Sequence, residues 1–135
     1  MDSKSRPRVL IAVQPSAWPL LKGMLEDIAD VVPAYTVDEA LQILQAADVD
    51  LVLATLTFSE SRMLEFLVAL KAEPTTSRIP FLCCRAVVGI LSEQLVESLG
   101  TAAKLCGAKD FVNIGNLSSE QARDALRAAV LKCLA

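Results

Sequence analysis

Residues 50–56, DLVLATL, decide the fold, because the residues from 51 to 54 are apolar without interruption. A strand with one solvated face alternates apolar and polar side chains, whereas a strand covered on both faces is apolar throughout. Residues 9–13 (VLIAV) and 79–84 (IPFLCC) share this nearly continuous apolar character. We therefore predict a parallel sheet whose central strands are covered by helices on both faces.

Segments with the helical spacing of apolar residues alternate with these strands. Shorter strands are predicted at 31–35 and 110–114, the former at an edge of the sheet because Pro33 cannot donate to a β-ladder. Helices are predicted after a Ser16 N-cap, from Thr36, between Ser59 and Pro74, over 90–106 and from Ser118. Five strands alternating with five helices predict a doubly wound α/β fold with right-handed crossovers.

Local patterns refine three of these helices. Residues 36–39 (TVDE) and 118–121 (SSEQ) have the spacing of capping boxes, in which a hydroxyl accepts a hydrogen bond from the amide three residues later. The helix over residues 90–106 is expected to bury the stripe formed by Leu91, Leu95, Leu99 and Cys106.

Length and charge limit the kinds of protein that this chain can be. Its 135 residues predict one domain, 1–135, with no attached output domain. The mean hydropathy is +0.45, yet no apolar run approaches the ~18 residues of a membrane span. The polar start, MDSKSRPR, lacks signal-peptide form, which predicts a cytoplasmic protein without membrane contact. A net charge of −3 argues against a nucleic-acid partner.

The side-chain inventory argues against an enzyme. The chain has no histidine, which removes His-based nucleophile pairs, zinc sites and phosphotransfer. It also lacks an acidic cluster and a glycine-rich phosphate loop, so we expect no metal and no cofactor. None of its cysteines has metal-ligand spacing, and all are interpreted as small buried apolar residues: Cys83, Cys84, Cys106 and Cys133.

Four segments in register resemble response-regulator receiver domains of the CheY-like type. They are residues 36–41 (TVDEAL), 50–56 (DLVLATL), 78–82 (RIPFL) and 107–112 (GAKDFV). The match to which they belong covers essentially the whole chain in the right order. The resemblance implies a flavodoxin-like, three-layer α/β/α fold with a five-stranded parallel sheet in the order 2-1-3-4-5. The first and last helices are expected on one face and the other three on the opposite face.

The same resemblance locates a site that has lost its chemistry. Receivers phosphorylate an aspartate that ends the third strand, using an acidic pair after the first strand to hold Mg²⁺, a Ser or Thr ending the fourth and a Lys ending the fifth. In that order, the matching positions here are Thr55, Val13 and Gln14, Arg85, and Ile114. Gly115 stands where the family usually has proline. The pattern implies a degenerate pseudo-receiver with no metal site.

The leading hypothesis is a phosphorylation-independent protein-interaction module in signal transduction, binding a signalling protein or a second copy of the chain. Residues 85–107 are longer than the family's usual spacing by about two helical turns and include the apolar run 86–91 (AVVGIL). That run either lies in the core or forms an interface. The candidate interface residues are Val87, Val88, Ile90 and Leu91, with Arg123 and Arg127 as a polar rim.

A rival hypothesis is a small-molecule or anion sensor that uses the vacated pocket at the carboxyl ends of the strands. Arg85 would anchor the anion, beside Thr55 and Thr57. The plainer interpretation of Arg85 is a solvated side chain, or a partner of Glu60 or of another nearby carboxylate. Trp18 either stacks on such a ligand or caps the core.

Overall fold

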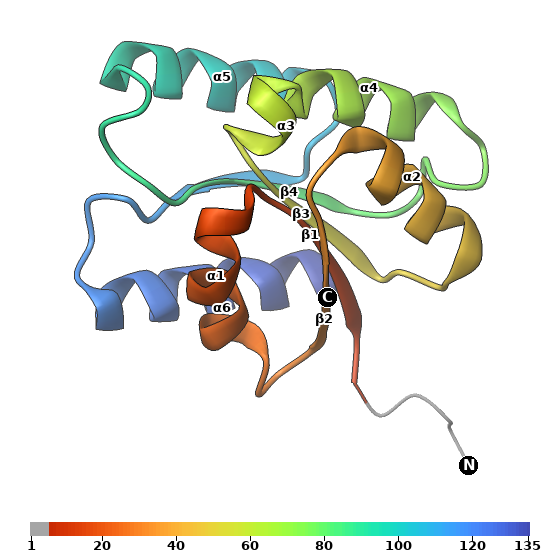
Figure 1. The fold of residues 1–135 in the computed structure, drawn as a ribbon, viewed down its shortest axis with the longest axis horizontal. Coiled ribbons are helices and arrows are strands. Elements are labelled where there is room, and N and C mark those ends of the chain that lie inside the picture. The colour runs from red at the N-terminus through yellow and green to blue at the C-terminus, as the bar shows by residue number, and fades with distance from the viewer. Residues whose placement is uncertain (1–5) are drawn as a thin grey trace.

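The computed structural model describes residues 6–135, so the polar segment 1–5 lies outside the described residues. Its five strands form one parallel sheet in the order β2-β1-β3-β4-β5 (Figure 1). The strands are β1 (Arg8–Ala12), β2 (Asp30–Ala34), β3 (Leu51–Thr55), β4 (Phe81–Arg85) and β5 (Asp110–Asn113). The predicted fold class and strand order are therefore confirmed. Pro33 lies in β2, at the edge of the sheet as expected.

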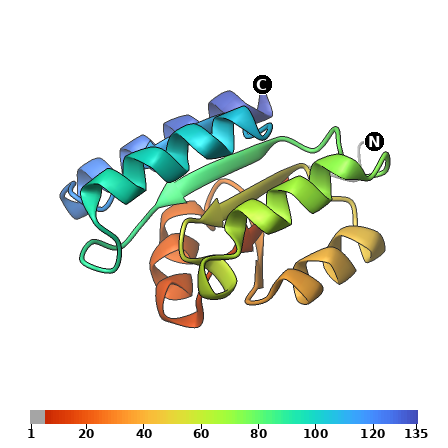
Figure 2. The ribbon, with the colours of Figure 1, turned by 90° about the horizontal axis from the view of Figure 1, so that it is seen from above.

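Helices cover both faces of this sheet. A 3₁₀ turn (Pro15–Ala17) leads into the first helix, α1 (Trp18–Leu25). The helices that follow along the chain are α2 (Val37–Ala46), α3 (Phe58–Ser61), α4 (Met63–Ala72), α5 (Glu93–Leu105) and α6 (Ser119–Leu134). Figures 1 and 2 show α1 and α6 on one face and α2, α4 and α5 on the other. Among residues 6–135, no helix is long and apolar enough to cross a membrane.

The continuous apolar strands follow from this layering. All residues of β3 are buried, and neighbouring side chains enter opposite layers: Val52 packs beneath α2, α4 and α5, whereas Leu53 packs beneath α1 and α6. In β1, Leu10 and Ile11 divide in the same way. Each such large side chain removed from water contributes about 1.5–3 kcal/mol. Because β1 and β3 must satisfy both layers, their polar residues stand only at the strand ends, Arg8 in β1 and Thr55 in β3.

The predicted capping box at Ser118 is complete, whereas the one at Thr36 is formed only in part, because Glu39 does not bond the amide of the N-cap residue itself. The amide of Glu39 donates to Thr36 Oγ1 at 3.1 Å, and the Glu39 carboxylate accepts from the amide of Tyr35. At the start of α6, Ser118 and Gln121 bond each other's backbone amides reciprocally. The predicted Ser16 N-cap is wrong: the 3₁₀ turn over Pro15–Ala17 leads directly into α1, and no side chain caps that helix.

The predicted helix over residues 90–106 begins later and is rotated from the expected stripe. It starts at Glu93 after an N-cap at Ser92, whose Oγ accepts from the amide of Leu95 at 3.1 Å. Its buried residues are Val96, Gly100 and Ala103, whereas Leu95 and Cys106 are exposed. Leu91 and Leu99 of the predicted stripe are partly buried against the core, so the prediction is wrong for Leu95 and Cys106. Small residues allow α5 to approach the sheet closely.

The cysteine interpretation holds for three of the four residues. Cys83, Cys84 and Cys133 are buried free thiols, and Cys106 is exposed. Burial raises the pKa of Cys83 to about 12 and raises the pKa of Cys84 further above its usual range. These two thiols therefore stay protonated and behave as small apolar residues, because a thiolate cannot be solvated at their positions.

Gly100 shows how tightly α5 packs. A Cβ atom at this position would lie 2.6 Å from Cδ2 of Phe111 in β5, whereas one at Gly23 in α1 would meet nothing within 4 Å. We expect Gly23→Ala to stabilise the protein by about 0.4–1 kcal/mol, because alanine loses less backbone entropy on folding. Gly100→Ala should instead destabilise it by about 1–3 kcal/mol, the usual cost of overpacking. Urea unfolding measures both, and equal stabilisation by the two changes contradicts this packing.

Candidate site at the carboxyl ends of the strands

The carboxyl ends of β3 and β4 and the segment after β1 surround a small hollow. Thr55 ends β3, Arg85 ends β4, and Gln14 and Thr57 complete its polar lining. The hollow has a volume of about 10 Å³, which is room for about one water molecule. The fold therefore brings together four of the side chains singled out from the sequence, but it closes the space between them.

Val13 and Ile114 do not line the hollow. Both are buried in the layer beneath α1 and α6, where they pack with other apolar residues. Trp18 packs against the same layer, so it caps the core and is not among the residues that line the hollow. The two positions that the sequence analysis matched to a receiver's metal ligand and lysine are thus part of the apolar core.

The hydroxyl groups in the hollow have no activating partner. Thr55 is 2% exposed, and its Oγ1 has no hydrogen-bond partner within residues 6–135. Thr57 Oγ1 donates to Gln14 Oε1. A hydroxyl needs a base or a metal ion beside it to become a nucleophile. Over the described part of the chain, no three His, Cys, Asp or Glu side chains gather closely enough to hold a metal ion.

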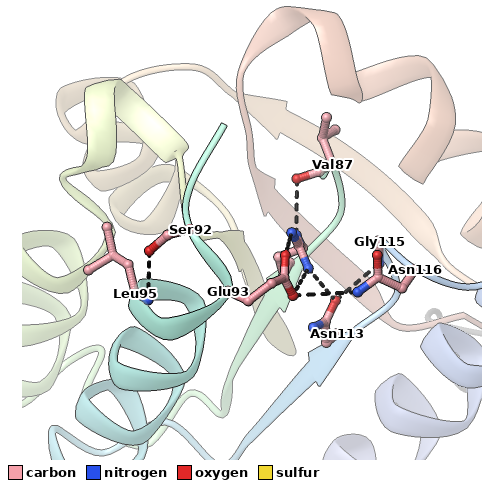
Figure 3. Close-up of polar contacts among 8 residues, drawn as sticks. Val87, Ser92, Glu93, Leu95, Asn113, Gly115 and Asn116 are labelled. Atoms are coloured by element: carbon pink, nitrogen blue, oxygen red, sulfur yellow. Dashed lines mark hydrogen bonds and ion pairs between the residues drawn. The ribbon is translucent and has the colours of Figure 1, made fainter. Parts of the chain in front are cut away.

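Arg85 is the charged residue that lines the hollow, and its guanidinium makes four hydrogen bonds. It is 2% exposed. Nη2 donates to Glu93 Oε2 at 2.5 Å and Nη1 to Glu93 Oε1 at 3.2 Å, a two-point ion pair. Nη1 also donates to Asn113 Oδ1 at 3.3 Å, and Nε donates to the carbonyl of Val87 at 3.1 Å (Figure 3). A bound anion would have to displace Glu93 and open the hollow.

The expected carboxylate partner exists, but it is Glu93 and not Glu60, and Arg85 is not solvated. Glu60 is exposed in a turn where Ser59, Glu60 and Ser61 have φ of 50°, 57° and 68°. That left-handed conformation is costly for residues other than glycine. The sequence signal for Glu93 is modest: an acidic residue directly after a serine N-cap favours the start of a helix there.

Gly115 leaves the space that Arg85 occupies. A Cβ atom at residue 115 would lie 2.8 Å from Arg85 Cδ and 3.1 Å from Val88 Cγ1. The amide of Gly115 donates to Asn113 Oδ1 at 3.2 Å, so the same asparagine oxygen serves both glycine and arginine. Arginine at 85 and glycine at 115 are therefore sterically matched.

The loop after β4, residues 86–92, presents apolar side chains to solvent. Val87, Val88 and Ile90 are 41%, 45% and 55% exposed, whereas Leu91 packs partly against the core. The two arginines expected at the rim lie on the side of α1 and of the turn after it. Arg127 bonds both carboxylate oxygens of Asp27 at 2.8 Å, and Arg123 lines a groove formed by α1 and the start of α6.

The Arg85 guanidinium lowers the pKa of the Glu93 carboxyl below its ordinary 4.5, chiefly through their hydrogen bonds. Because the folded-state pKa is depressed, the pair stabilises the fold above pH 4.5, and this contribution is lost as the pH falls through the folded value. We expect NMR titration of Glu93 to show this depression and Arg85→Met to abolish it. Glu65, whose pKa is lowered by Arg62, should titrate identically in both proteins. An unshifted Glu93 in the wild type contradicts the pair.

Solved receiver structures share this fold along nearly their whole length. The phosphorylated cyanobacterial phytochrome response regulator RcpA is 17% identical, with a TM-score of 0.78 over 97% of this chain and 96% of that chain. A putative response regulator from Chloroflexus aurantiacus is 18% identical, with a TM-score of 0.77 over 96% and 98%. The chemotaxis response regulator CheY4 of Vibrio cholerae is 20% identical, with a TM-score of 0.66 over 92% and 98%.

No protein-family model matches the sequence, and no curated protein matches it. The likeness is therefore carried by three-dimensional structure, at identities where it speaks for the fold alone. The order of the sheet, its parallel strands and the two helical layers agree with that likeness throughout. The chain has the CheY-like flavodoxin fold of response-regulator receiver domains.

Proposed function

We propose that this chain is a phosphorylation-independent pseudo-receiver that acts in signal transduction by binding another protein. The observation that carries the proposal is the exposed apolar loop after β4, which lies directly beside a closed and uncharged phosphoacceptor position. A receiver communicates through its surface, and its chemistry serves to change that surface. The proposal is that this chain binds through an apolar surface without that chemistry.

The loss of chemistry is argued from the residues at the site. Phosphoryl transfer to a receiver needs a carboxylate nucleophile, a divalent ion and a cation that faces the developing charge. Thr55 is a hydroxyl, Gln14 is neutral and bonded to Thr57, and Val13 and Ile114 belong to the core. The remaining cation, Arg85, is neutralised by Glu93. We infer that the protein is not an enzyme and works without a metal or cofactor.

The binding role is argued from the loop. Val87, Val88 and Ile90 are adjacent apolar side chains that are each more than two-fifths exposed. Covering a large aliphatic side chain contributes about 1.5–3 kcal/mol, so a few of them suffice to anchor a modest interface. The occupant is a signalling protein or a second copy of the chain.

The first test is phosphorylation. We expect no mass increase of a phosphoryl group when the protein is incubated with acetyl phosphate and Mg²⁺, because no carboxylates hold the ion. Thr55→Asp restores the nucleophile but not the metal ligands, so it should also remain unmodified. Intact-mass spectrometry measures both, with a phosphorylatable receiver as the positive control. A hydroxylamine-labile adduct on the wild type overturns the pseudo-receiver proposal.

The second test is the loop itself. We expect Val88→Asp with Ile90→Asp to keep the circular dichroism spectrum and to weaken self-association or partner capture by about a hundredfold, since two buried side chains contribute about 3 kcal/mol or more. Leu91 is spared because it packs partly against the core. Val68→Asp is the matched control, since Val68 is 53% exposed but lies on α4.

Light scattering and affinity capture measure the effect on a second copy and on a signalling protein, respectively. Unfolding of the double variant contradicts the placement of these residues at the surface. A folded double variant that associates as well as the wild type and the Val68→Asp control places the binding surface elsewhere.

A further inference from the structure

We infer that Arg85 is a positioning residue for the loop of residues 86–92, and that it fixes the exposed apolar side chains in one arrangement without a phosphoryl group. The inference rests on the proposed function for its biological consequence. Its structural content concerns the protein alone, and it is carried by the contacts of one buried guanidinium with the loop, with α5 and with the end of β5.

The first contact sets the direction of the loop as it leaves the sheet. Arg85 Nε donates to the carbonyl oxygen of Val87, two residues along the chain, at 3.1 Å. Figure 3 shows this carbonyl pointing toward the polar cluster and the Val87 side chain pointing away from it. Holding the carbonyl inward therefore holds the side chain outward, where it is 41% exposed.

The second contact fixes the other end of the loop. Glu93 is the first residue of α5, and both of its carboxylate oxygens accept from Arg85, at 2.5 and 3.2 Å. A planar guanidinium that meets a carboxylate at two points restrains orientation as well as distance. Residues 85 and 93 flank the loop on either side, so the ion pair between them holds its two ends together.

The third set of contacts connects the Arg85–Glu93 ion pair to the end of β5 and the loop that follows it. Asn113 Oδ1 accepts from Arg85 Nη1 at 3.3 Å and from the amide of Gly115 at 3.2 Å. Asn116 Nδ2 donates to Glu93 Oε1 at 3.5 Å. Gly115, which has no Cβ, lets the arginine side chain pass. Residues from both loops thus converge on one ion pair.

Burial distinguishes this pair from an ordinary surface ion pair. The side chain of Arg85 is 2% exposed and that of Glu93 is 63% exposed. An exposed pair exchanges freely with water and restrains little. A buried guanidinium loses its compensation when the carboxylate leaves, so conformations in which Glu93 moves away are disfavoured. The loop is therefore held in place because moving Glu93 away would leave the buried charge of Arg85 without its partner.

The experiment measures backbone ¹⁵N order parameters in the free protein. In the wild type, residues 86–92 should be near the value of rigid backbone, about 0.85, and in Glu93→Ala they should fall below about 0.6. Glu65→Ala is the matched control: it removes a carboxylate that bonds Arg62 at 2.5 Å in the first turn of α4, so it should leave residues 86–92 unchanged. The urea midpoint separates this local loosening from global unfolding.

Gly115→Ala provides a second variant that keeps both charges. Its Cβ would lie 2.8 Å from Arg85 Cδ, so it should displace the arginine and loosen residues 86–92 in the same way. If the loop of Glu93→Ala stays as ordered as that of the wild type, Arg85 does not position it. The order parameters are measured without any partner. A negative result in the binding tests therefore does not contradict the role of Arg85, and an ordered loop in Glu93→Ala does not contradict the proposed binding function.

Discussion

The structure depends on one constraint: β1 and β3, the central strands, must be covered on both faces. Their side chains alternate between the layer beneath α1 and α6 and the layer beneath α2, α4 and α5, and all of them in β3 are buried. The cost of leaving such strands exposed forces helices onto both sides of the sheet. Because every strand is parallel, all carboxyl ends meet at one edge, and that edge is where polar residues can gather.

Much of the fold was predictable because its signals are local. Runs of apolar residues marked the strands, and the Thr36 and Ser118 boxes marked two helix starts. The start of α5 was missed because Ile90 and Leu91 extend an apolar pattern that looks helical, although the chain is a loop there. Which face of α5 packs inward was also missed. That choice depends on how closely the helix approaches Phe111, because only a small residue such as Gly100 fits where the helix and the sheet are in close contact.

The candidate site was predictable in position but not in its contacts. The resemblance to receivers placed Thr55 and Arg85 at the same edge, and the structure agrees. The partner of Arg85 could not be derived, because Glu93 reaches it only through the path of an irregular loop, and Asn113 comes from a strand twenty-eight residues away in sequence. The role of Gly115 is equally non-local, since its missing side chain matters only once Arg85 lies against it.

The fit between Arg85 and Gly115 also links two positions that are thirty residues apart in the sequence. A side chain at residue 115 meets Arg85 at 2.8 Å, and a smaller residue at position 85 leaves Glu93 without its partner. A carboxylate introduced at Thr55 enters a hollow of about 10 Å³ with no acidic neighbour to share a cation. Residues 85 and 115 are therefore coupled: a change at either one disturbs contacts that involve the other, so the effects of such changes on stability are not additive.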